Sequence, residues 1–134
     1  MAKNTSFVEL KKIFDILHSP KGCLWDKKQT HKSLIPYLKE ESAEFIAAIR
    51  KGDRQHMKEE LGDILIQVMF HSKIAQKEGQ FDIEDVIKYL IKKLKRRHPH
   101  VFGNVKVKST REAIRSWNRI KLLEKKSSLK PFGK

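Results

Sequence analysis

The sequence predicts an all-α protein built from four or five helices. Apolar residues recur at spacings of three and four along most of the chain, which is the period of an amphipathic helix. Capping residues precede the candidate helices, Gly or Pro follows most of them, and no alternation typical of a strand is convincing. The 134 residues suit one domain. We expect this domain over residues 1–126 and a flexible tail over residues 127–134.

The first helix is predicted over Phe7–Leu17, where apolar residues recur at helical spacing. Ser6 and Glu9 in front of it match an S-x-x-E capping box. The stretch from His18 to Thr30 contains a proline and a glycine and is expected to form an ordered loop. Trp25 is the expected anchor of this loop, because a large aromatic side chain buries much apolar surface.

The second helix is predicted from about Lys32 to Lys51. Thr30 or Ser33 is the expected cap, because a hydroxyl accepts a hydrogen bond from a free N–H at a helix start. Pro36 is compatible with this helix only in its first turn, where the missing N–H matters little. Gly52 is expected to end the helix, because glycine adopts the left-handed conformation of a C-cap without a steric penalty.

Asp53 is expected to cap the third helix, which is predicted over Arg54–Glu78 and ends at Gly79. A fourth helix is predicted over Ile83–Arg97, with Asp82 as its cap. It should end there because a proline follows at position 99 and cannot continue a helix.

The connector over residues 98–108 is expected to be extended or irregular. Ser109 and Glu112 then form a second capping box, which predicts a fifth helix over Thr110–Lys126. We find no internal repeat and no low-complexity segment, so the helices must pack on one another to form the core.

The charge of the chain is strongly positive but unevenly distributed. The net charge is +14, which by itself favours binding to nucleic acid or another polyanion. Residues 40–63 instead hold seven acids and only four bases. An acidic pocket in a basic protein suits a cation together with a polyanion, for example Mg²⁺ with a phosphate chain. A solvated basic surface accounts for the net charge equally well.

The sequence indicates a cytoplasmic protein without a membrane segment. No apolar run approaches the roughly 18 to 20 residues that a helix needs to span a bilayer, and the start of the chain lacks the apolar region of a secretion signal. Cys23 is the only cysteine, which excludes an internal disulfide and fits a reducing compartment.

Five carboxylates in the second and third helices lie close to the predicted core. On a helical wheel, Glu41 falls about 20° beyond the apolar stripe of its helix, with Glu44 and then Glu40 further round. Glu60 and Asp63 share one face of the largely apolar third helix. Burial of several carboxylates together is unfavourable unless they are protonated or a cation neutralises them.

None of these five acids has a Lys or Arg three or four residues away, so helical salt bridges do not account for them. Oxygen ligands from two adjacent helices favour a hard cation, Mg²⁺ or Mn²⁺. Salt bridges to more distant lysines are the alternative. His56, four residues before Glu60, is the one local histidine, and we expect His56 and His71 to lie at the surface or core edge rather than to bind metal.

Other catalytic sites fit the sequence poorly. A di-iron carboxylate bundle needs Glu-x-x-His, which is absent. The presence of only one cysteine and the absence of a His-Glu-x-x-His pattern argue against a zinc site. No glycine-rich P-loop with its lysine is present either, so the chain is not a P-loop NTPase.

A basic counterpart lies in the fourth and fifth helices. Arg97 projects within the apolar stripe of its helix, with Lys93 one turn earlier and Arg96 nearby, and guanidinium groups suit contact with phosphate. A solvated helix end is the plainer alternative. Trp117 and Lys121 lie one turn apart and could stack on a base and meet a phosphate, although such a tryptophan is more often a core residue.

The order of these motifs resembles a known family. The acids form E-E-x-x-E and E-x-x-D on paired helices, accompanied by GCLWDKKQT, EELGDILIQVMFHS, EGQFDIEDVI, KLKRRHPHVFG and SWNRIK over about residues 7–125. This pattern resembles the MazG nucleotide pyrophosphohydrolases of the all-α NTP pyrophosphatase superfamily. Leu24 stands where the family usually has proline, and Asn118 where an acid is commoner.

The resemblance implies an Mg²⁺-dependent enzyme that cleaves nucleoside triphosphates to monophosphate and pyrophosphate and cleanses nucleotide pools. It implies metal ligands at Glu41, Glu44, Glu60 and Asp63, with Glu40 adjacent as a residue that could serve a second ion. Glu40, or a metal-bridging carboxylate such as Glu41, is the expected catalytic residue that orients the attacking water or takes its proton. It implies phosphate binding by Lys93, Arg96 and Arg97 and base stacking by Trp117, with Lys121 nearby. Mn²⁺ is a possible substitute for Mg²⁺.

The third helix is apolar nearly all round, so a second subunit is expected to cover one face, most simply in a homodimer, with a tetramer as an alternative. The rival hypothesis is a non-catalytic helical module that binds nucleotides, nucleic acid or a protein through its basic surface. The absence of local cations around the acids favours the enzyme.

Overall fold

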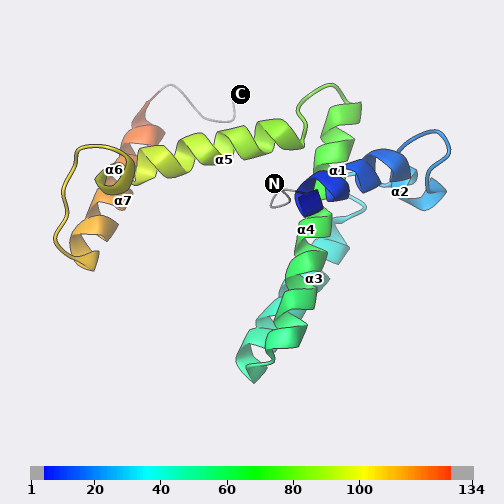
Figure 1. Cartoon of the computed structure of the whole chain (residues 1–134), viewed down its shortest axis with the longest axis horizontal. Coiled ribbons are helices and arrows are strands. Elements are labelled where there is room, and N and C mark those ends of the chain that lie inside the picture. Colours follow the sequence, from blue (N-terminus) through cyan, green and yellow to red (C-terminus); the bar gives the residue numbers. More distant parts are fainter. Residues whose placement is uncertain (1–4, 128–134) are drawn as a thin grey trace. The chain divides into compact units, whose positions relative to one another are not determined.

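The computed structural model describes residues 5–127 and confirms the all-α prediction, because every regular element in this range is a helix (Figure 1). Five helices are long and match the predicted ones; two are short. In chain order they are α1 (Thr5–Leu17), α2 (Leu24–Lys28), α3 (Ile35–Lys51), α4 (Arg54–Lys77), α5 (Ile83–Arg97), α6 (Pro99–Phe102) and α7 (Thr110–Lys126). Apart from Ser127, the predicted tail over residues 127–134 lies outside the described residues.

The chain divides into two compact units, residues 1–83 and 84–134, which we call unit 1 and unit 2 and describe separately. The division falls at the first residue of α5. One domain over residues 1–126 remains a prediction from the sequence.

Unit 1 is organised around the hairpin of α3 and α4, which pack side by side (Figure 1). Gly52 ends α3 with φ +69°, the left-handed conformation predicted for it. Asp53 caps α4 as predicted, because its side chain accepts a hydrogen bond from the His56 N–H at 3.1 Å. The tight turn therefore places α3 and α4 antiparallel.

The core of unit 1 forms where α1 packs on α4. Phe14 of α1 meets Phe70 of α4 edge to face at 5.6 Å between ring centroids, the geometry that aromatic quadrupoles favour. Leu34, Met69 and Ile74 complete the buried cluster. On the surface, Lys73 forms an ion pair with Asp15, and the Lys77 ammonium donates to the Lys27 carbonyl at 3.3 Å. These contacts fix α1 and α2 against the C-terminal half of α4.

Two predictions near the start of the chain are wrong. Ser6 does not cap α1, because α1 already includes Thr5 and Ser6 is a helical residue. The predicted loop after α1 contains the one-turn helix α2, too short to show a helical period. Trp25 in α2 is half-exposed, and its ring contacts Tyr37 and Phe70 edge to face.

Neither Thr30 nor Ser33 caps α3, whose N-cap is Leu34 without a side-chain hydrogen bond. Instead these two residues satisfy each other across the preceding turn. The Thr30 N–H donates to Ser33 Oγ at 2.9 Å, and the Ser33 N–H donates to Thr30 Oγ1 at 3.0 Å. Pro36 lies in the first turn of α3, as expected.

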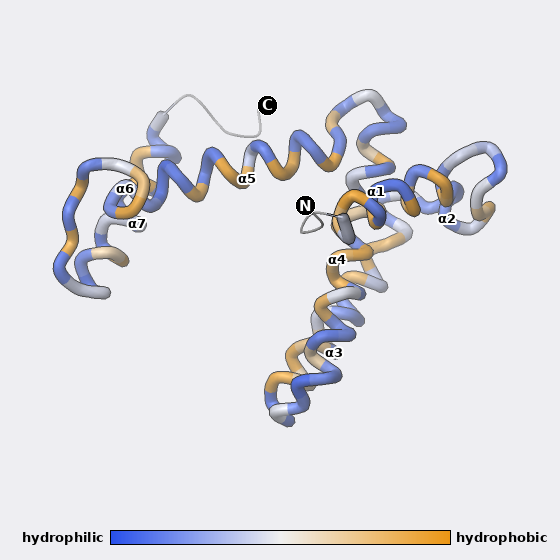
Figure 2. Tube along the Cα trace, viewed as in Figure 1, coloured by the Kyte–Doolittle hydropathy of each residue, from blue (hydrophilic) through white to orange (hydrophobic). Residues whose placement is uncertain are grey.

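Unit 2 contains α5, α6 and α7, and both long helices keep their predicted bounds. Orange apolar segments recur along α5 in Figure 2, consistent with its amphipathic sequence. The connector expected to be extended or irregular includes the short helix α6. Ser109 accepts a hydrogen bond from the Glu112 N–H at 3.2 Å, and the Glu112 carboxylate accepts from the Lys108 N–H at 2.8 Å. The predicted capping box is therefore formed with its second bond shifted by one residue.

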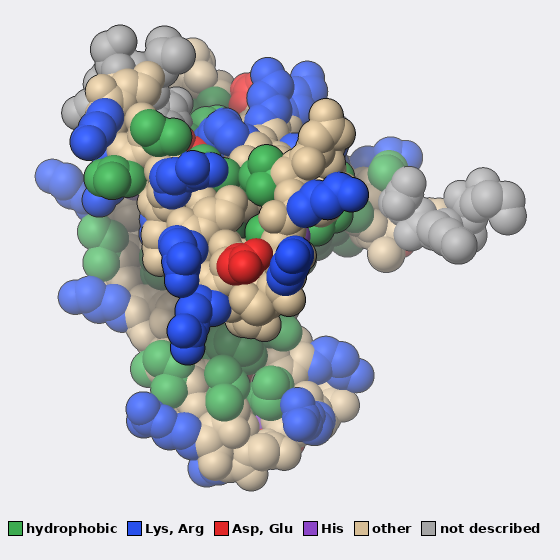
Figure 3. All heavy atoms as spheres, turned by 90° about the vertical axis from the view of Figure 1, so that its left-hand side faces the viewer, with side chains coloured by type: hydrophobic (Ala, Val, Ile, Leu, Met, Phe, Trp, Pro, Cys, Tyr) green, Lys and Arg blue, Asp and Glu red, His purple; other side chains and the backbone are tan. Residues whose placement is uncertain are grey.

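Within the described residues, no helix is both long and apolar enough to cross a membrane. Lys and Arg side chains are scattered over the face drawn in Figure 3, with few acids among them. This matches the positive net charge of the sequence.

Candidate functional site

The five predicted acids lie on the α3–α4 hairpin and differ in exposure. Glu60 is buried at 8% exposure, and Glu41 and Asp63 are partly buried. Glu44 and Glu40 are exposed, in the order that the helical wheel predicts. The structure therefore brings three of the acids together and leaves Glu40 at the margin.

Glu41, Glu60 and Asp63 form one cluster, in which one carboxylate oxygen of each lies within 4.8 Å of the others. Burial raises the pKa of Glu41 to about 7, and a hydrogen bond with Glu60 and the charges of Asp63, Glu60 and Glu40 act in the same direction. Glu60 Oε1 is buried and has no hydrogen-bond partner among the described residues. The cluster needs either a proton or a cation.

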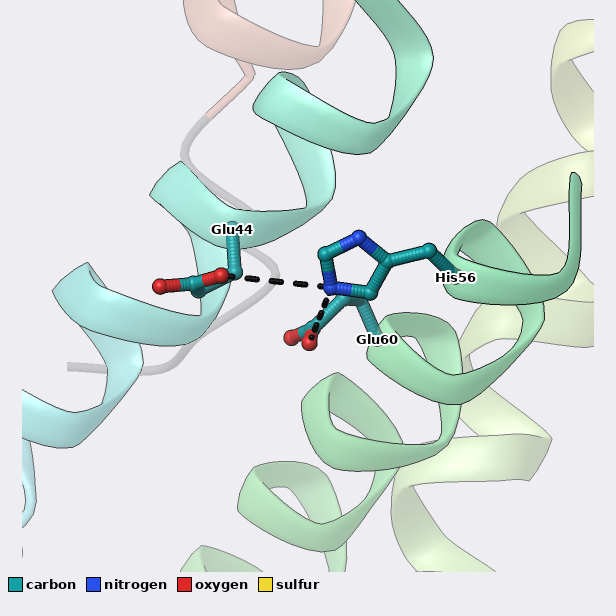
Figure 4. Close-up of side chains that lie close together, drawn as sticks. All are labelled: Glu44, His56 and Glu60. Atoms are coloured by element: carbon teal, nitrogen blue, oxygen red, sulfur yellow. Dashed lines mark hydrogen bonds and ion pairs between the residues drawn. The ribbon is translucent and has the colours of Figure 1, made fainter. Parts of the chain in front are cut away.

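A second cluster shares Glu60 and includes a histidine (Figure 4). His56 Nε2 lies 3.1 Å from Glu60 Oε2 and 3.9 Å from Glu44 Oε1 on the facing helix. The imidazole is half-buried and points into the space between α3 and α4. The sequence predicts His56 at the surface or core edge, but it does not predict the contact with Glu44 across the hairpin.

In the part of the chain that the structure describes, no Lys or Arg forms an ion pair with any of the five acids. The alternative of salt bridges to distant lysines thus finds no support among residues 5–127. Only His56 supplies a potential positive charge to Glu44 and Glu60 there. The four carboxylates and one imidazole of the two clusters are donors that a divalent cation accepts.

The predicted phosphate-binding residues lie in unit 2, where Arg96 and Arg97 share one acidic partner. Arg96 Nε lies 2.5 Å from Glu124 Oε2, and Arg97 Nη2 lies 2.7 Å from Glu124 Oε1. The hydrogen bond from Arg97, followed by that from Arg96, lowers the pKa of Glu124 to about 2, although burial acts in the opposite direction. A carboxylate thus occupies the guanidinium groups that are predicted to meet phosphate.

Trp117 is partly buried beside Arg97 and His98. The Arg97 guanidinium lies 5.3 Å from the centroid of its ring, a cation–π distance, and the His98 ring meets it edge to face at 5.1 Å. Lys93 stands over the Tyr89 ring at 5.7 Å, and Lys121 is exposed on α7. The structure groups Arg96, Arg97 and Trp117, and it places Lys93 and Lys121 outside this set of contacts.

Two contacts were missed from the sequence, His56 with Glu44 and Glu124 with the arginine pair. His56 lies four residues before Glu60, so half of its contact was visible as helical spacing. Its approach to Glu44 depends on how α3 packs on α4. Glu124 is 27 residues from Arg97, and no local pattern joins them.

Comparison with known proteins gives one family and several relatives. A family model described as the MazG nucleotide pyrophosphohydrolase domain matches residues 29–102. The chain is 54% identical over 119 residues to a nucleoside triphosphate pyrophosphohydrolase/pyrophosphatase MazG from Thermotoga maritima, covering 89% of this chain and 45% of that protein. It is 42% identical over 104 residues to a nucleoside triphosphate pyrophosphohydrolase from Escherichia coli, covering 78% of this chain and 40% of that protein.

The chain therefore spans less than half the length of these two relatives. Among solved structures, a mazG-related protein from Thermotoga maritima is similar, with a TM-score of 0.68 and 28% identity. That match covers 84% of this chain and 98% of the solved chain. The matched family segment includes all five acids and the arginine pair.

Proposed function

The chain belongs to the MazG nucleotide pyrophosphohydrolase family, and on this basis we propose that it hydrolyses nucleoside triphosphates, NTPs or dNTPs, to the monophosphate and pyrophosphate with Mg²⁺. Cleansing of nucleotide pools in the cytoplasm is the proposed role. The observation that carries the proposal is the buried Glu60, which lies with Glu41 and Asp63 where no Lys or Arg of residues 5–127 neutralises them.

The donor set fits a divalent cation. We propose Glu41, Glu44, Glu60 and Asp63 as the residues that hold Mg²⁺, or Mn²⁺ in its place, because oxygen donors suit these hard ions. The raised pKa of Glu41 and the unpartnered Glu60 oxygen support this assignment, since both reflect carboxylates that are withdrawn from water without a compensating cation. When bound, the ion supplies positive charge to phosphate oxygens and acidifies water.

The reaction needs a base and a place for the leaving group. Hydrolysis joins a water oxygen to the α-phosphorus, breaks the bond to the bridging oxygen and releases pyrophosphate. Glu40 is exposed beside the cluster and Glu41 belongs to it, so we assign either carboxylate as the acceptor of the proton from the attacking water. These two are the proposed catalytic residues.

Binding of the polyphosphate is assigned to Lys93, Arg96 and Arg97, whose charges neutralise the leaving pyrophosphate. Trp117 is the proposed stacking partner of the base, with Lys121 one turn later on the same helix. The contact of Arg97 with the Trp117 ring supports a shared binding role for these two residues. Phosphate must replace Glu124 as the partner of the guanidinium groups.

A homodimer is part of the proposal, with a tetramer as the alternative. Large apolar side chains remain exposed along α3 and α4, including Leu38 and Ile49 on the first helix and Leu61, Leu65 and Val68 on the second. A hairpin of two helices buries too little apolar surface by itself, so a second copy packed on it would supply the missing core.

The test is pyrophosphate release from a panel of NTPs and dNTPs with Mg²⁺. Glu41→Gln and Glu60→Gln should each lose turnover by about 100-fold or more, because the cluster then lacks a carboxylate that binds the ion or takes a proton. The matched control is Glu59→Gln, which removes an exposed acid directly beside Glu60. Equal turnover in all four proteins would exclude the assigned site.

The same panel tests the non-catalytic alternative, which the basic surface favours (Figure 3). That alternative predicts no turnover of any nucleotide with Mg²⁺ or Mn²⁺. It predicts nucleic-acid binding that weakens steeply as salt increases, because phosphate contacts release bound counterions.

A further inference from the structure

His56 lies where a metal ligand would lie, at the N-terminal end of α4 and facing Glu44 across the hairpin (Figure 4). Its Nε2 atom and one oxygen each of Glu44 and Glu60 lie within 4.8 Å of one another. Ligand atoms about 2.0–2.2 Å from a common ion lie at most about 4.4 Å apart, slightly less than this limit. The three side chains can therefore converge on one ion after small rotations.

A second observation also points to a ligand. Glu60 is 8% exposed, and its Oε1 atom has no hydrogen-bond partner among the described residues, while its Oε2 atom faces His56. An unpaired buried carboxylate oxygen is costly, and a cation relieves that cost. One Glu60 oxygen faces the histidine and the other has no partner, so the carboxylate can bridge two ions.

We propose that Glu44, His56 and Glu60 form a second divalent-cation site, which shares Glu44 and Glu60 with the proposed Mg²⁺ site that also contains Glu41 and Asp63. The nitrogen ligand decides which ion enters. An imidazole suits transition ions such as Co²⁺ or Zn²⁺, whereas Mg²⁺ prefers oxygen ligands. The second site therefore prefers a transition ion, whereas the all-oxygen site takes Mg²⁺ or Mn²⁺ and accepts Co²⁺ or Zn²⁺ when these are the only divalent ions present. This inference rests on the proposed function for the first ion only.

The alternative is that His56 merely donates a hydrogen bond to Glu60. The two arrangements differ in what happens at Nε2. As a ligand, this atom gives its lone pair to the ion and the ring keeps its proton on Nδ1. As a donor, the same atom carries a proton, and added metal leaves it unchanged.

The experiment measures metal binding rather than catalysis. Co²⁺ and Zn²⁺ are titrated into the 134-residue chain by calorimetry, and the ring nitrogens of ¹⁵N-histidine are followed by NMR with Zn²⁺. The wild type should bind two transition ions per chain, and the His56 Nε2 signal should shift on binding. His56→Asn should lose the second ion or weaken it at least about tenfold, because even an indirect supporting group of a metal ligand is worth that much.

His31→Asn is the matched control. His31 stacks on His71 elsewhere in unit 1, with 2.8 Å between their Nδ1 atoms, and this pair is the obvious competing position for a transition ion. His31→Asn should keep both ions. The proposal is overturned if His31→Asn loses the second ion or if His56→Asn binds as many transition ions as tightly as the wild type does. It is also overturned if the His56 Nε2 signal does not shift when Zn²⁺ is added.

A second variant, His56→Gln, excludes misfolding of His56→Asn as the cause of the loss. Circular dichroism checks that His56→Gln is folded, and the folded protein must also lose the second ion. Pyrophosphate release by the wild type with Mg²⁺ is measured in parallel. Turnover with only one Co²⁺ bound would overturn the second site and leave the proposed function intact. Two Co²⁺ ions without turnover of any nucleotide would overturn the function and support the second site.

Discussion

At the scale of single residues, Glu41 links the acidic cluster to pH. Its pKa rises from 4.5 to about 7 in the folded chain, chiefly through burial. The folded state therefore favours the protonated form more than the unfolded state does. This contribution to stability is fully present below pH 4.5 and is lost as the pH rises through about 7.

We predict that the metal-free protein loses thermal stability between these two pH values and that Glu41→Gln shows a shallower loss, because glutamine does not ionise. The measurement is the unfolding temperature in a chelating buffer from pH 4 to 8. Added Mg²⁺ should restore stability on the alkaline side, where ionised Glu41 can bind it. Identical pH profiles for the two proteins would contradict the assigned role of Glu41.

Glu124 holds two cationic side chains, and its removal should destabilise unit 2. We predict that Glu124→Gln lowers the free energy of unfolding by about 1–2 kcal/mol, because hydrogen bonds between charged groups are lost from a partly buried position. Urea unfolding measures the change. Lys125→Gln, at an exposed neighbouring position, should alter stability little. An equal loss of unfolding free energy in both variants would show that the contacts of Glu124 with the arginines do not stabilise unit 2.

At the scale of the elements, the turn between α3 and α4 depends on Gly52. Its φ of +69° is unfavourable for residues with a Cβ atom, although a Cβ there would meet no other atom within 4 Å. We predict that Gly52→Ala costs about 1 kcal/mol of stability through the backbone alone. Gly52→Asn should cost less, because asparagine tolerates the left-handed region. Chemical denaturation of both variants checks the order, and an equal loss would contradict a backbone origin.

The sequence predicts the long helices well because capping residues and glycine mark where these helices begin and end. Gly52 and Asp53 mark one boundary and Ser109 another, and each acts in the structure as its residue type predicts. Short elements lack such information, since α2 and α6 each span about one turn and show no period. Ser6 and Ser33 match capping patterns but lie inside a helix and in a turn, because the same hydroxyl chemistry serves all three positions.

The sequence predicts those features of the candidate site that depend on spacing within a single helix. Helical spacing placed Glu41, Glu60 and Asp63 near the core, and the structure brings these three together. The contacts of His56 with Glu44 and of Glu124 with Arg97 depend on helix packing, which spacing within one helix cannot express. The assigned roles in metal and phosphate binding remain predictions.

At the scale of the whole molecule, the apolar surface of α4 is the main unexplained feature of a single chain. Leu61, Leu65 and Val68 recur at helical spacing and are 50%, 39% and 39% exposed. By the helical wheel, this face lies about 100° round from Glu60, so a partner can cover it without displacing the acids. An exposed apolar stripe of this kind is typical of a surface that pairs with another protein.

We predict that the wild type is a dimer or tetramer and that Leu65→Lys shifts it towards monomer, because a charge in an apolar contact is costly. Light scattering after size-exclusion chromatography measures the mass. Gln55→Lys, at an exposed polar position near the start of the same helix, should leave the mass unchanged. A monomeric wild type at high protein concentration would refute the oligomer.

All five acids and His56 lie between residues 40 and 63, on one hairpin closed by a tight turn at Gly52. A loop this short loses little entropy on closure, and contacts close in sequence form quickly during folding. The contact of Phe14 with Phe70 joins residues much further apart and should form later. The ligands for a cation can therefore assemble on the nascent hairpin before the core closes, so that a bound ion would speed the folding of the chain as well as serve its chemistry.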